Sequence, residues 1–178
     1  QTPLNNQLHS REGLSIRELE PCSKITVRGN IADIAAAING VTEMSADMPA
    51  NTYTTNTAAS LYWMGPDERM IHHTNADASA LVLQLREKLP AGQSAVVDVS
   101  DYYTVIQLAG AKARASLASG TPFDVHPRVF TLGQCTQTRF GNASVLLSCK
   151  PDDTFDVQVR WSFAEYVWQY LCRVGSYV

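Results

Sequence analysis

The segment KITVRGNIADIAAAING, residues 24–40, changes its hydrophobic period within a few residues. Polar and apolar side chains alternate from Lys24 to Gly29, which is the pattern of a half-buried strand. Asn30 can cap a helix, and Gly40 marks the expected end of that helix. The apolar residues between these two fall at helical spacing, at Ile31, Ile34, Ala35 and Ile38. The segment therefore predicts a strand that leads directly into a helix.

The rest of the first half extends this pair of elements with three more strands and a second helix. Strands are predicted at residues 52–56, 59–64 and 69–73, with a tight turn at Gly65–Glu68. A helix then begins at Asn75 or Asp77 and is closed by Pro90 and Gly92. The order of elements in the first half is therefore βαβββα.

The second half has a similar order. Strands are predicted at residues 94–99, 104–108, 135–140, 144–149 and 155–159, with helices at 110–118 and 162–174. Gly141 and Asn142 have the composition of a hairpin turn between two of these strands. The order here is ββαβββα.

Strands and helices intermingle without the regular alternation of a doubly wound sheet. We therefore predict an α+β fold of two layered mixed or antiparallel sheets with flanking helices. Residues 1–20 lack a sustained period and are expected to form a polar arm that lies against a partner or is disordered. Residues 21–178 form the domain, in two packed halves at about 21–92 and 93–178. No sequence repeat is strong enough to prove a duplication.

Composition argues against two classes of partner. The chain has 178 residues, a hydrophobic content of 45% and a formal net charge of −3. This charge offers no basic face for nucleic acid and no polybasic cluster for a membrane. No apolar run approaches the roughly 18 residues of a membrane span, and no charged segment leads into an apolar signal region. The expected location is the cytoplasm.

The four cysteines show no paired short spacing of the kind that places two thiolates on one metal ion. No metal site is therefore predicted. Cys135 and Cys149 flank the expected turn at Gly141 and Asn142, so a disulfide across this hairpin is conceivable. In a cytoplasmic chain the reduced, buried form is favoured.

Reactive side chains crowd into the stretch Asp124–Phe130, whose sequence is DVHPRVF. Asp124 could orient the His126 ring, but no nucleophile or ligand set accompanies the pair. Pro127 stiffens the backbone, so the favoured interpretation is a rigid loop held by hydrogen bonds. The adjacent His72 and His73 point to opposite faces of a strand and cannot share a metal ion without distortion. No Gly-x-Ser-x-Gly motif, phosphate loop or dinucleotide fingerprint occurs.

The C-terminal helix carries one narrow polar stripe and is otherwise apolar. The stripe consists of Ser162, Glu165, Gln169 and Arg173. A helix this apolar is expected to be covered on a second side. Trp168 and Tyr170, with Trp161 just before the helix, are residue types that anchor protein interfaces. The alternative is that the helix lies between two layers of its own domain.

Several motifs resemble, in order, those of the gamma subunit of heterotetrameric sarcosine oxidase. They are Leu61–Glu68, Asp98–Asp101, Val105–Gly110, Asp124–Phe130, Gln137–Thr138 and Val159–Trp168. The resemblance covers about three quarters of the chain, from roughly Leu19 onward. An ordered set of motifs is far more specific than any one of them.

The resemblance implies a fold like the folate-binding part of glycine-cleavage aminomethyltransferase, in a subunit without catalytic, cofactor-binding or metal-binding residues. Such complexes join an alpha subunit with NAD and a folate-binding region, a beta subunit with FAD, and a zinc-bearing delta subunit. FMN is held at the alpha and beta subunits. The assembly oxidatively demethylates sarcosine to glycine, yields formaldehyde or 5,10-methylenetetrahydrofolate, and reduces oxygen to hydrogen peroxide.

The candidate residues on this chain are therefore those of a partner interface or a structural loop. They are Asp124, His126, Arg128, Trp161, Trp168 and Tyr170. Two alternatives stay open. One is the equivalent small subunit of a related complex that oxidises another N-methylated amino acid, such as N-methylglutamate. The other is an autonomous folate-binding protein like the aminomethyltransferase.

Overall fold

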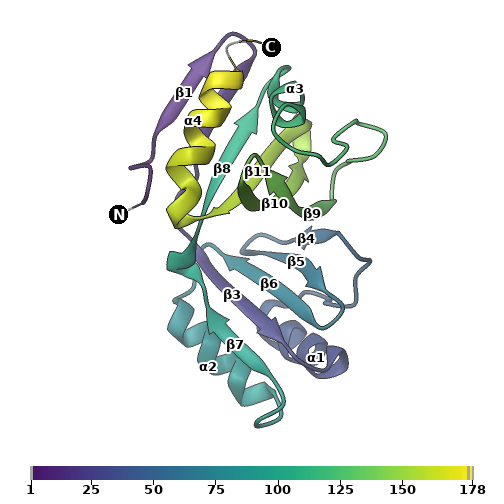
Figure 1. Ribbon diagram of the computed structural model, residues 1–178. Helices are drawn as coiled ribbons and strands as arrows, with labels where there is room; N and C mark the ends of the chain where they lie inside the picture. Colours follow the sequence, from purple (N-terminus) through teal and green to yellow (C-terminus); the bar gives the residue numbers. More distant parts are fainter. Residues whose placement is uncertain (1, 176, 178) are drawn as a thin grey trace. The chain divides into compact units, whose positions relative to one another are not determined.

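The structure, a computed structural model, describes residues 2–175 and residue 177. The chain divides into two compact units, which are described separately (Figure 1). One unit joins residues 1–20 to residues 101–178, and the other is Pro21–Ser100. Each contains one antiparallel sheet with helices, so the predicted α+β class is confirmed.

The Pro21–Ser100 unit has the order of elements expected for its first six, followed by one more strand. They are β3 (Ser23–Arg28), α1 (Ile31–Thr42), β4 (Tyr53–Thr55), β5 (Ala59–Gly65), β6 (Glu68–His73), α2 (Ala78–Lys88) and β7 (Ala95–Asp98). The strands lie in the order β4-β5-β6-β3-β7. Both helices pack their apolar residues against Ile25, Val27, Leu61 and Ile71 of the sheet.

Local signals set the helix starts in this unit. The Asn30 side chain accepts a hydrogen bond from Ala32 N at 2.9 Å, and Asp77 Oδ1 accepts from Ser79 N at 2.7 Å. The predicted end of α1 at Gly40 is wrong. The helix continues to Thr42 and ends at Glu43, which adopts the left-handed conformation with φ 58°. Glycine costs about 1 kcal/mol inside a helix, which the packing of Ala37 and Ile38 offsets.

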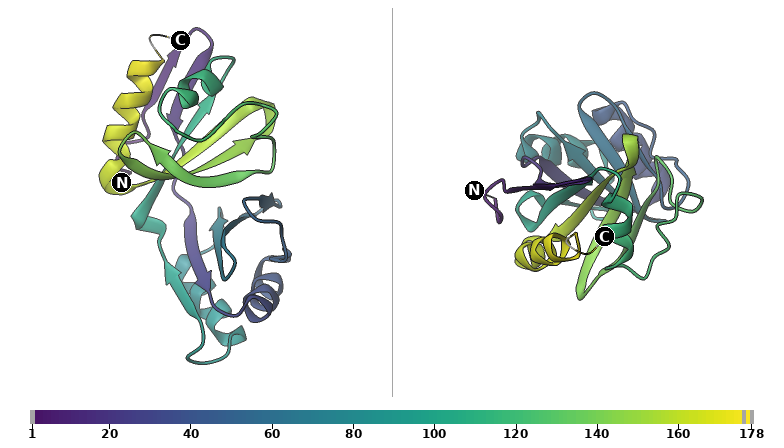
Figure 2. Two further views of the ribbon diagram at one scale, coloured as in Figure 1. Left: turned by 45° about the vertical axis from the view of Figure 1, so that its right-hand side comes forward. Right: turned by 90° about the horizontal axis from the view of Figure 1, so that it is seen from above.

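The other unit is built on a six-stranded sheet in the order β1-β2-β8-β11-β10-β9. Its elements are β1 (Leu8–Arg11), β2 (Leu14–Glu18), β8 (Tyr103–Ala109), α3 (Ala113–Ala118), β9 (Cys135–Phe140), β10 (Ala143–Lys150), β11 (Thr154–Arg160) and α4 (Ala164–Val174). Helix α4 lies along one face of the sheet (Figure 2). Its Val167 and Leu171 share a core with Ile16 and Val157. Short 3₁₀ turns occupy Ser100–Tyr102, Pro151–Asp153 and Trp161–Phe163.

The sequence predicts that residues 1–20 form a polar arm that lies against a partner or is disordered, but residues 8–11 and 14–18 are strands of the sheet. The strands β1 and β2 form a hairpin at Gly13, and β2 pairs with β8. Leu14 and Ile16 are buried in the core. The alternation of β2 spans only five residues, and its main partner lies about 90 residues further along the chain, so no local pattern reveals it.

Strand pairing also decides two other expectations. The predicted halves meet at residues 92 and 93, whereas β7 pairs with β3 and the units divide after Ser100. The hairpin at Gly141 and Asn142 is confirmed, but its register pairs Cys135 with Ser148. Cys149 therefore points to the opposite face of the sheet from Cys135, and the two thiols cannot form a disulfide.

Among the residues described, no helix is long and apolar enough to cross a membrane.

Candidate functional site

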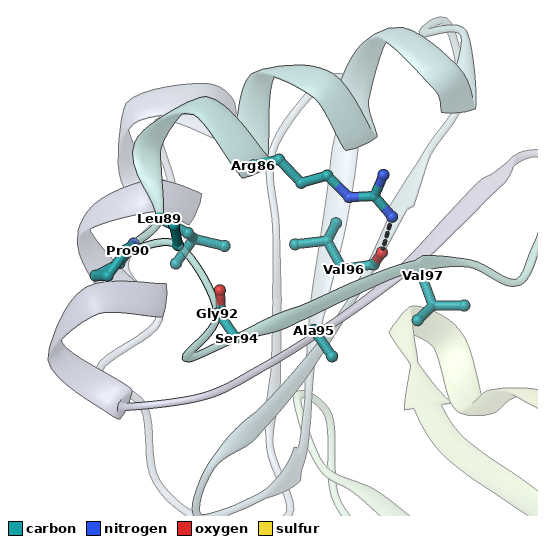
Figure 3. A pocket seen from close by; sticks show the side chains of 9 residues that line it. Arg86, Leu89, Pro90, Gly92, Ser94, Ala95, Val96 and Val97 are labelled. Atoms are coloured by element: carbon teal, nitrogen blue, oxygen red, sulfur yellow. Dashed lines mark hydrogen bonds between the residues drawn. The ribbon is translucent and has the colours of Figure 1, made fainter.

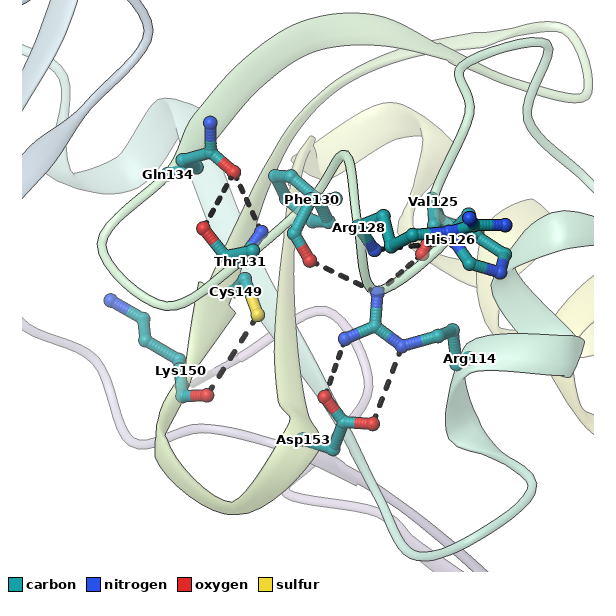
Figure 4. A network of polar contacts seen from close by, with 10 residues as sticks. All are labelled: Arg114, Val125, His126, Arg128, Phe130, Thr131, Gln134, Cys149, Lys150 and Asp153. Carbon is teal, nitrogen blue, oxygen red and sulfur yellow. Dashed lines mark hydrogen bonds and ion pairs between the residues drawn. The ribbon is translucent and has the colours of Figure 1, made fainter.

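The loop at residues 119–134, which contains the DVHPRVF stretch, is held from below by Arg114 of α3 (Figure 4). Arg114 Nη1 donates to the carbonyl oxygens of Val125 and, at 3.1 Å, Phe130. The guanidinium forms two further hydrogen bonds to the Asp153 carboxylate. It lies 4.7 Å from the ring centre of Phe155. One side chain thus joins the loop to the β10–β11 turn.

Two reactive side chains of the loop, those of Asp124 and His126, accept hydrogen bonds from the loop's own backbone. Asp124 Oδ1 accepts from His126 N at 2.9 Å, and His126 Nδ1 accepts from Arg128 N at 3.2 Å. The carbonyl of His126 accepts from Val129 N and Phe130 N at 2.8 and 2.9 Å. The structure therefore brings Asp124, His126 and Arg128 together as a chain of turns, with all three side chains exposed.

A pocket of about 210 Å³ lies beside this loop. It is lined by Arg114, Pro127, Phe130, Thr131, Leu132 and Cys149–Asp153. The hydrogen bonds from Arg114 lower the pKa of Asp153, and the same contact raises the pKa of Arg114. Burial raises the pKa of the Cys149 thiol. The thiol is therefore held in its protonated form near neutral pH, which is the unreactive state of cysteine.

The aromatic residues of α4 mostly make contacts within their own unit. Trp168 is 6% exposed and belongs to the core. The Tyr170 hydroxyl donates to Ser119 O at 3.2 Å, and its ring meets Phe140 edge to face. The Tyr166 hydroxyl accepts from Asn142 N at 3.1 Å. These contacts fix both the hairpin tip and the start of the loop.

Other aromatic side chains stay at the surface. Trp161, Phe163 and Tyr166 are 38%, 39% and 37% exposed. Nearby, the Arg160 guanidinium lies 5.2 Å from the ring centre of Tyr102, which is itself 46% exposed. Of the three aromatic residues predicted as interface anchors, Trp161 is thus the most accessible, and the interface role stays a prediction.

The adjacent histidines of β6 have separate surroundings. The ring of His72 lies 4.6 Å from that of Tyr62, whereas His73 Nδ1 accepts from Asn75 N and Ala76 N at 3.2 and 3.1 Å. In the part of the chain that the structure describes, no three His, Cys, Asp or Glu residues gather as a metal site would require.

Among the residues that the structure describes, two carboxylates, Glu18 and Asp156, are buried, and both bind groups of their own unit. Glu18 accepts from Thr104 Oγ1 at 2.7 Å and from Asn6 N at 2.9 Å. Asp156 accepts from Gln107 Nε2 at 2.8 Å and lies 3.6 Å from Lys150 Nζ. Burial raises the pKa of Asp156 and lowers that of Lys150.

Sequence reasoning missed Arg114, Asp153 and Tyr166. Arg114 lies in an alanine-rich helix, where an arginine usually indicates a solvated face. Asp153 is 39 residues further along the chain, at a turn where aspartate is ordinary. A sequence signal does exist for Tyr166, since it lies four residues before Tyr170 on the same face of the helix.

Comparisons of the chain with known proteins agree on one family. The model of the sarcosine oxidase, gamma subunit family matches residues 28–176. The sarcosine oxidase subunit gamma of Corynebacterium sp. (strain U-96) is 30% identical over 117 residues, which cover 66% of this chain and 56% of that protein. The chain thus matches little more than half of that relative's length. Subunit gamma of Corynebacterium sp. (strain P-1) is 25% identical over 168 residues, covering 92% of this chain and 80% of that protein.

Two solved structures show the same fold. One is the heterotetrameric sarcosine oxidase from Corynebacterium sp. U-96 in complex with pyrrole 2-carboxylate. It matches with a TM-score of 0.87 and 22% identity over 99% of this chain and 94% of that chain. The other is the glycine cleavage system aminomethyltransferase T from Bartonella henselae, with a TM-score of 0.66 and 14% identity over 86% of this chain and 44% of that chain. The predicted likeness in fold to the glycine-cleavage enzyme is confirmed.

Proposed function

The chain belongs to the sarcosine oxidase gamma subunit family, and from this we propose that it is the structural gamma subunit of a heterotetrameric, flavin-dependent sarcosine oxidase. Its partners are then an alpha, a beta and a delta subunit.

One observation carries the structural role: the side chains of Asp124 and His126 in the loop, and of Arg114 on α3, are committed to backbone groups. Asp124 and His126 accept backbone N–H groups, and Arg114 donates to two backbone carbonyls and to Asp153. A general base needs a lone pair directed at its substrate. The Nδ1 lone pair of His126 points instead at Arg128 N, within the loop. This arrangement supports a preformed surface rather than a catalytic centre.

In this proposal the chemistry resides on the other subunits. The complex oxidatively demethylates sarcosine to glycine, yields formaldehyde or 5,10-methylenetetrahydrofolate, and passes electrons to oxygen as hydrogen peroxide. FAD, FMN, NAD, zinc and tetrahydrofolate are held by the partners, and this chain stabilises their arrangement. A cytoplasmic location stays a prediction from the sequence.

Co-expression tests the proposal directly. Produced with the other three subunits, the chain should co-purify in a 1:1 ratio with each of them by mass spectrometry of the intact complex. Produced alone, it should aggregate as its concentration rises, because surfaces that the partners cover would be exposed. A stable, monomeric chain that does not bind the other subunits would contradict the proposal.

The likeness in fold to aminomethyltransferase T favours one alternative, an autonomous folate-binding enzyme. The two buried carboxylates do not fit this function well, because Glu18 and Asp156 already bind groups of their own sheet. Calorimetry of the isolated chain with tetrahydrofolate separates the two functions. Micromolar binding of tetrahydrofolate would favour the folate-binding enzyme, and the absence of binding heat at millimolar tetrahydrofolate would exclude that function.

The second alternative, a small subunit of an N-methylglutamate-type complex, differs only in the substrate. The co-purified assembly should therefore be assayed with sarcosine and with N-methylglutamate. Whichever of the two amines is turned over at the lower concentration identifies the substrate of the complex.

A further inference from the structure

The strand β7 ends the five-stranded sheet of the Pro21–Ser100 unit, next to β3. One side of its backbone pairs with β3, so the other side carries N–H and C=O groups that no strand of this sheet uses. Such an edge is a template for another extended chain.

The hydrogen-bond pattern shows which groups face outward. Val99 N donates to Lys24 O at 2.8 Å, so Val99 directs its backbone toward β3. Antiparallel pairing alternates this direction from one residue to the next. Ala95 and Val97 therefore face β3 as well, and the backbone groups of Val96 and Asp98 face outward. The contact of Val96 O with an arginine of α2 confirms this direction.

A pocket of about 440 Å³ follows this edge, between β7 and the end of α2 (Figure 3). Its lining consists of Arg86, Leu89–Gly92 and Ser94–Val97. Most of these residues are apolar or small, and Val97 is 49% exposed. The pocket therefore combines outward backbone groups with an apolar wall, as a groove for an extended peptide requires.

The strand itself lacks the residues that usually prevent pairing, although Arg86 of α2 binds one of its outward carbonyls. Natural edge strands are protected by charged side chains, proline or bulges. The residues Ala95, Val96 and Val97 are all apolar. The strand's one charged residue, Asp98, is engaged elsewhere, since its Oδ1 accepts from Ser100 N and Ser100 Oγ at 2.9 and 2.6 Å.

The only charged side chain among the pocket-lining residues is a cation, Arg86. Arg86 Nη2 donates to Val96 O at 2.9 Å. This bond uses one of the five N–H donors of the guanidinium and one of the two lone pairs of the carbonyl. Val96 O can thus accept a second hydrogen bond from an added strand. The remaining donors of Arg86 suit a carboxylate, which a guanidinium binds in a planar, bidentate fashion.

We propose that β7 pairs with an extended segment of a partner subunit, and that this segment carries an aspartate or glutamate side chain that binds Arg86. The segment adds a sixth strand through the outward groups of Val96 and Asp98, and apolar side chains beside its carboxylate cover Val97. This inference rests on the proposed function, because it takes its occupant from the proposed assembly.

The charge at Arg86 provides the first test, carried out on the co-expressed assembly. Arg86→Glu should weaken binding of this chain to its partners at least tenfold, whereas Arg86→Lys, which keeps the charge, should lose threefold or less. Lys88→Glu is the matched control, since the Lys88 side chain reaches toward Gly40 on α1 rather than toward β7. Equal effects of Arg86→Glu and Lys88→Glu would overturn the proposed contact.

Hydrogen exchange provides a second test that does not depend on the variants. The amides of Val96 and Asp98 in the wild-type chain should exchange at least tenfold more slowly in the assembly than in the free chain. Unchanged exchange in an intact assembly would overturn the β7 proposal and leave the proposed function standing. Failure to co-purify at all would overturn both. Slow exchange already present in a dimer of the free chain would assign the edge to a second copy and would also overturn the proposal.

Discussion

Each unit of the chain uses an arginine to hold an irregular segment, but the two arginines differ in burial and in what balances their charge. In the Pro21–Ser100 unit, Arg69 is 3% exposed and donates to Ala46 O, Gly65 O and Glu68 O at 3.0, 2.6 and 2.8 Å. In the other unit, Arg114 binds two carbonyls and the Asp153 carboxylate. Burial lowers the pKa of Arg69, whereas the bonds to Asp153 raise the pKa of Arg114.

The difference shows two ways to order a loop without regular structure. Among the described residues, the hydrogen bonds of Arg69 go to carbonyl groups, and the charge of Asp47 raises its pKa without a hydrogen bond between the two side chains. Arg114 lies nearer to the surface and shares its charge with an exposed partner, since the Asp153 side chain is 62% exposed. We therefore expect the Arg69 segment to depend mainly on the geometry of its hydrogen bonds, and the Arg114 loop to depend partly on ionisation.

Replacing each arginine with methionine should give the largest effects and tests this contrast. Arg69→Met leaves three carbonyls without their donors and should lower the free energy of unfolding by about 3 kcal/mol. Arg114→Met should cost about 2 kcal/mol, because water can reach part of its site. Urea unfolding of the full chain measures both values. A larger cost for Arg114→Met than for Arg69→Met would mean that the ion pair with Asp153 contributes more to stability than the hydrogen bonds to carbonyls.

Lysine variants sharpen the same contrast, because they keep the charge and remove the planar fork of donors. Arg69→Lys should still cost about 2 kcal/mol, since one ammonium cannot reach the separate carbonyls of Ala46 and Gly65. Arg114→Lys should cost about 1 kcal/mol, because the ammonium can keep the Asp153 pair while it loses one carbonyl. The same urea titration measures both variants. Equal losses of unfolding free energy in Arg69→Lys and Arg114→Lys would contradict the view that charge matters more at Arg114.

The local part of the fold could be predicted from the sequence, and the pairing of distant segments could not. Asn30, Asp77 and the Gly141–Asn142 turn act within a few residues, so their side chains identify caps and a hairpin directly. The placement of β2 beside β8 and of β7 beside β3 depends on partners far along the chain. A short alternating pattern does not specify which strand it joins.

The candidate site shows the same limit. The rigid-loop interpretation of Asp124 and His126 agrees with their hydrogen bonds, because Asp-x-His and the proline after it act locally. Arg114 supplies the main support, yet no pattern near the loop points to it. Trp168 and Tyr170 were predicted from residue type as interface anchors, but residue type does not distinguish a core contact from an interface contact.

Ionisation of Asp153 should give a smaller, pH-dependent effect. The pKa of Asp153 in the folded chain lies below its unfolded value of about 3.9. The pair therefore stabilises the fold above that unfolded pKa, and this contribution is lost as the pH falls through the folded pKa. Because the carboxylate is mostly exposed and screened, Asp153→Asn should cost less than about 1 kcal/mol at pH 7.

Thermal unfolding of the wild type and Asp153→Asn from pH 7 to pH 3 measures this effect. The difference between the two proteins should shrink as the pH falls. Asp67→Asn is the matched control, because Asp67 binds Arg28 at 2.9 Å in an exposed pair between the short β5–β6 turn and β3. A pH-independent difference at Asp153 would contradict an ionic contribution to the Arg114 loop.

The smallest effect is expected at His126, which first draws attention as a reactive residue. Its ring is exposed and accepts one hydrogen bond at 3.2 Å, whereas the backbone bonds from Val129 N and Phe130 N to His126 O survive in His126→Ala. The free energy of unfolding should fall by only about 0.5 kcal/mol. Turnover per intact assembly should stay within twofold of the wild type, even if less assembly forms. A collapse of turnover in fully assembled complex would mean that the ring touches the reacting groups, and that this loop does more than Arg69's segment does in the other unit.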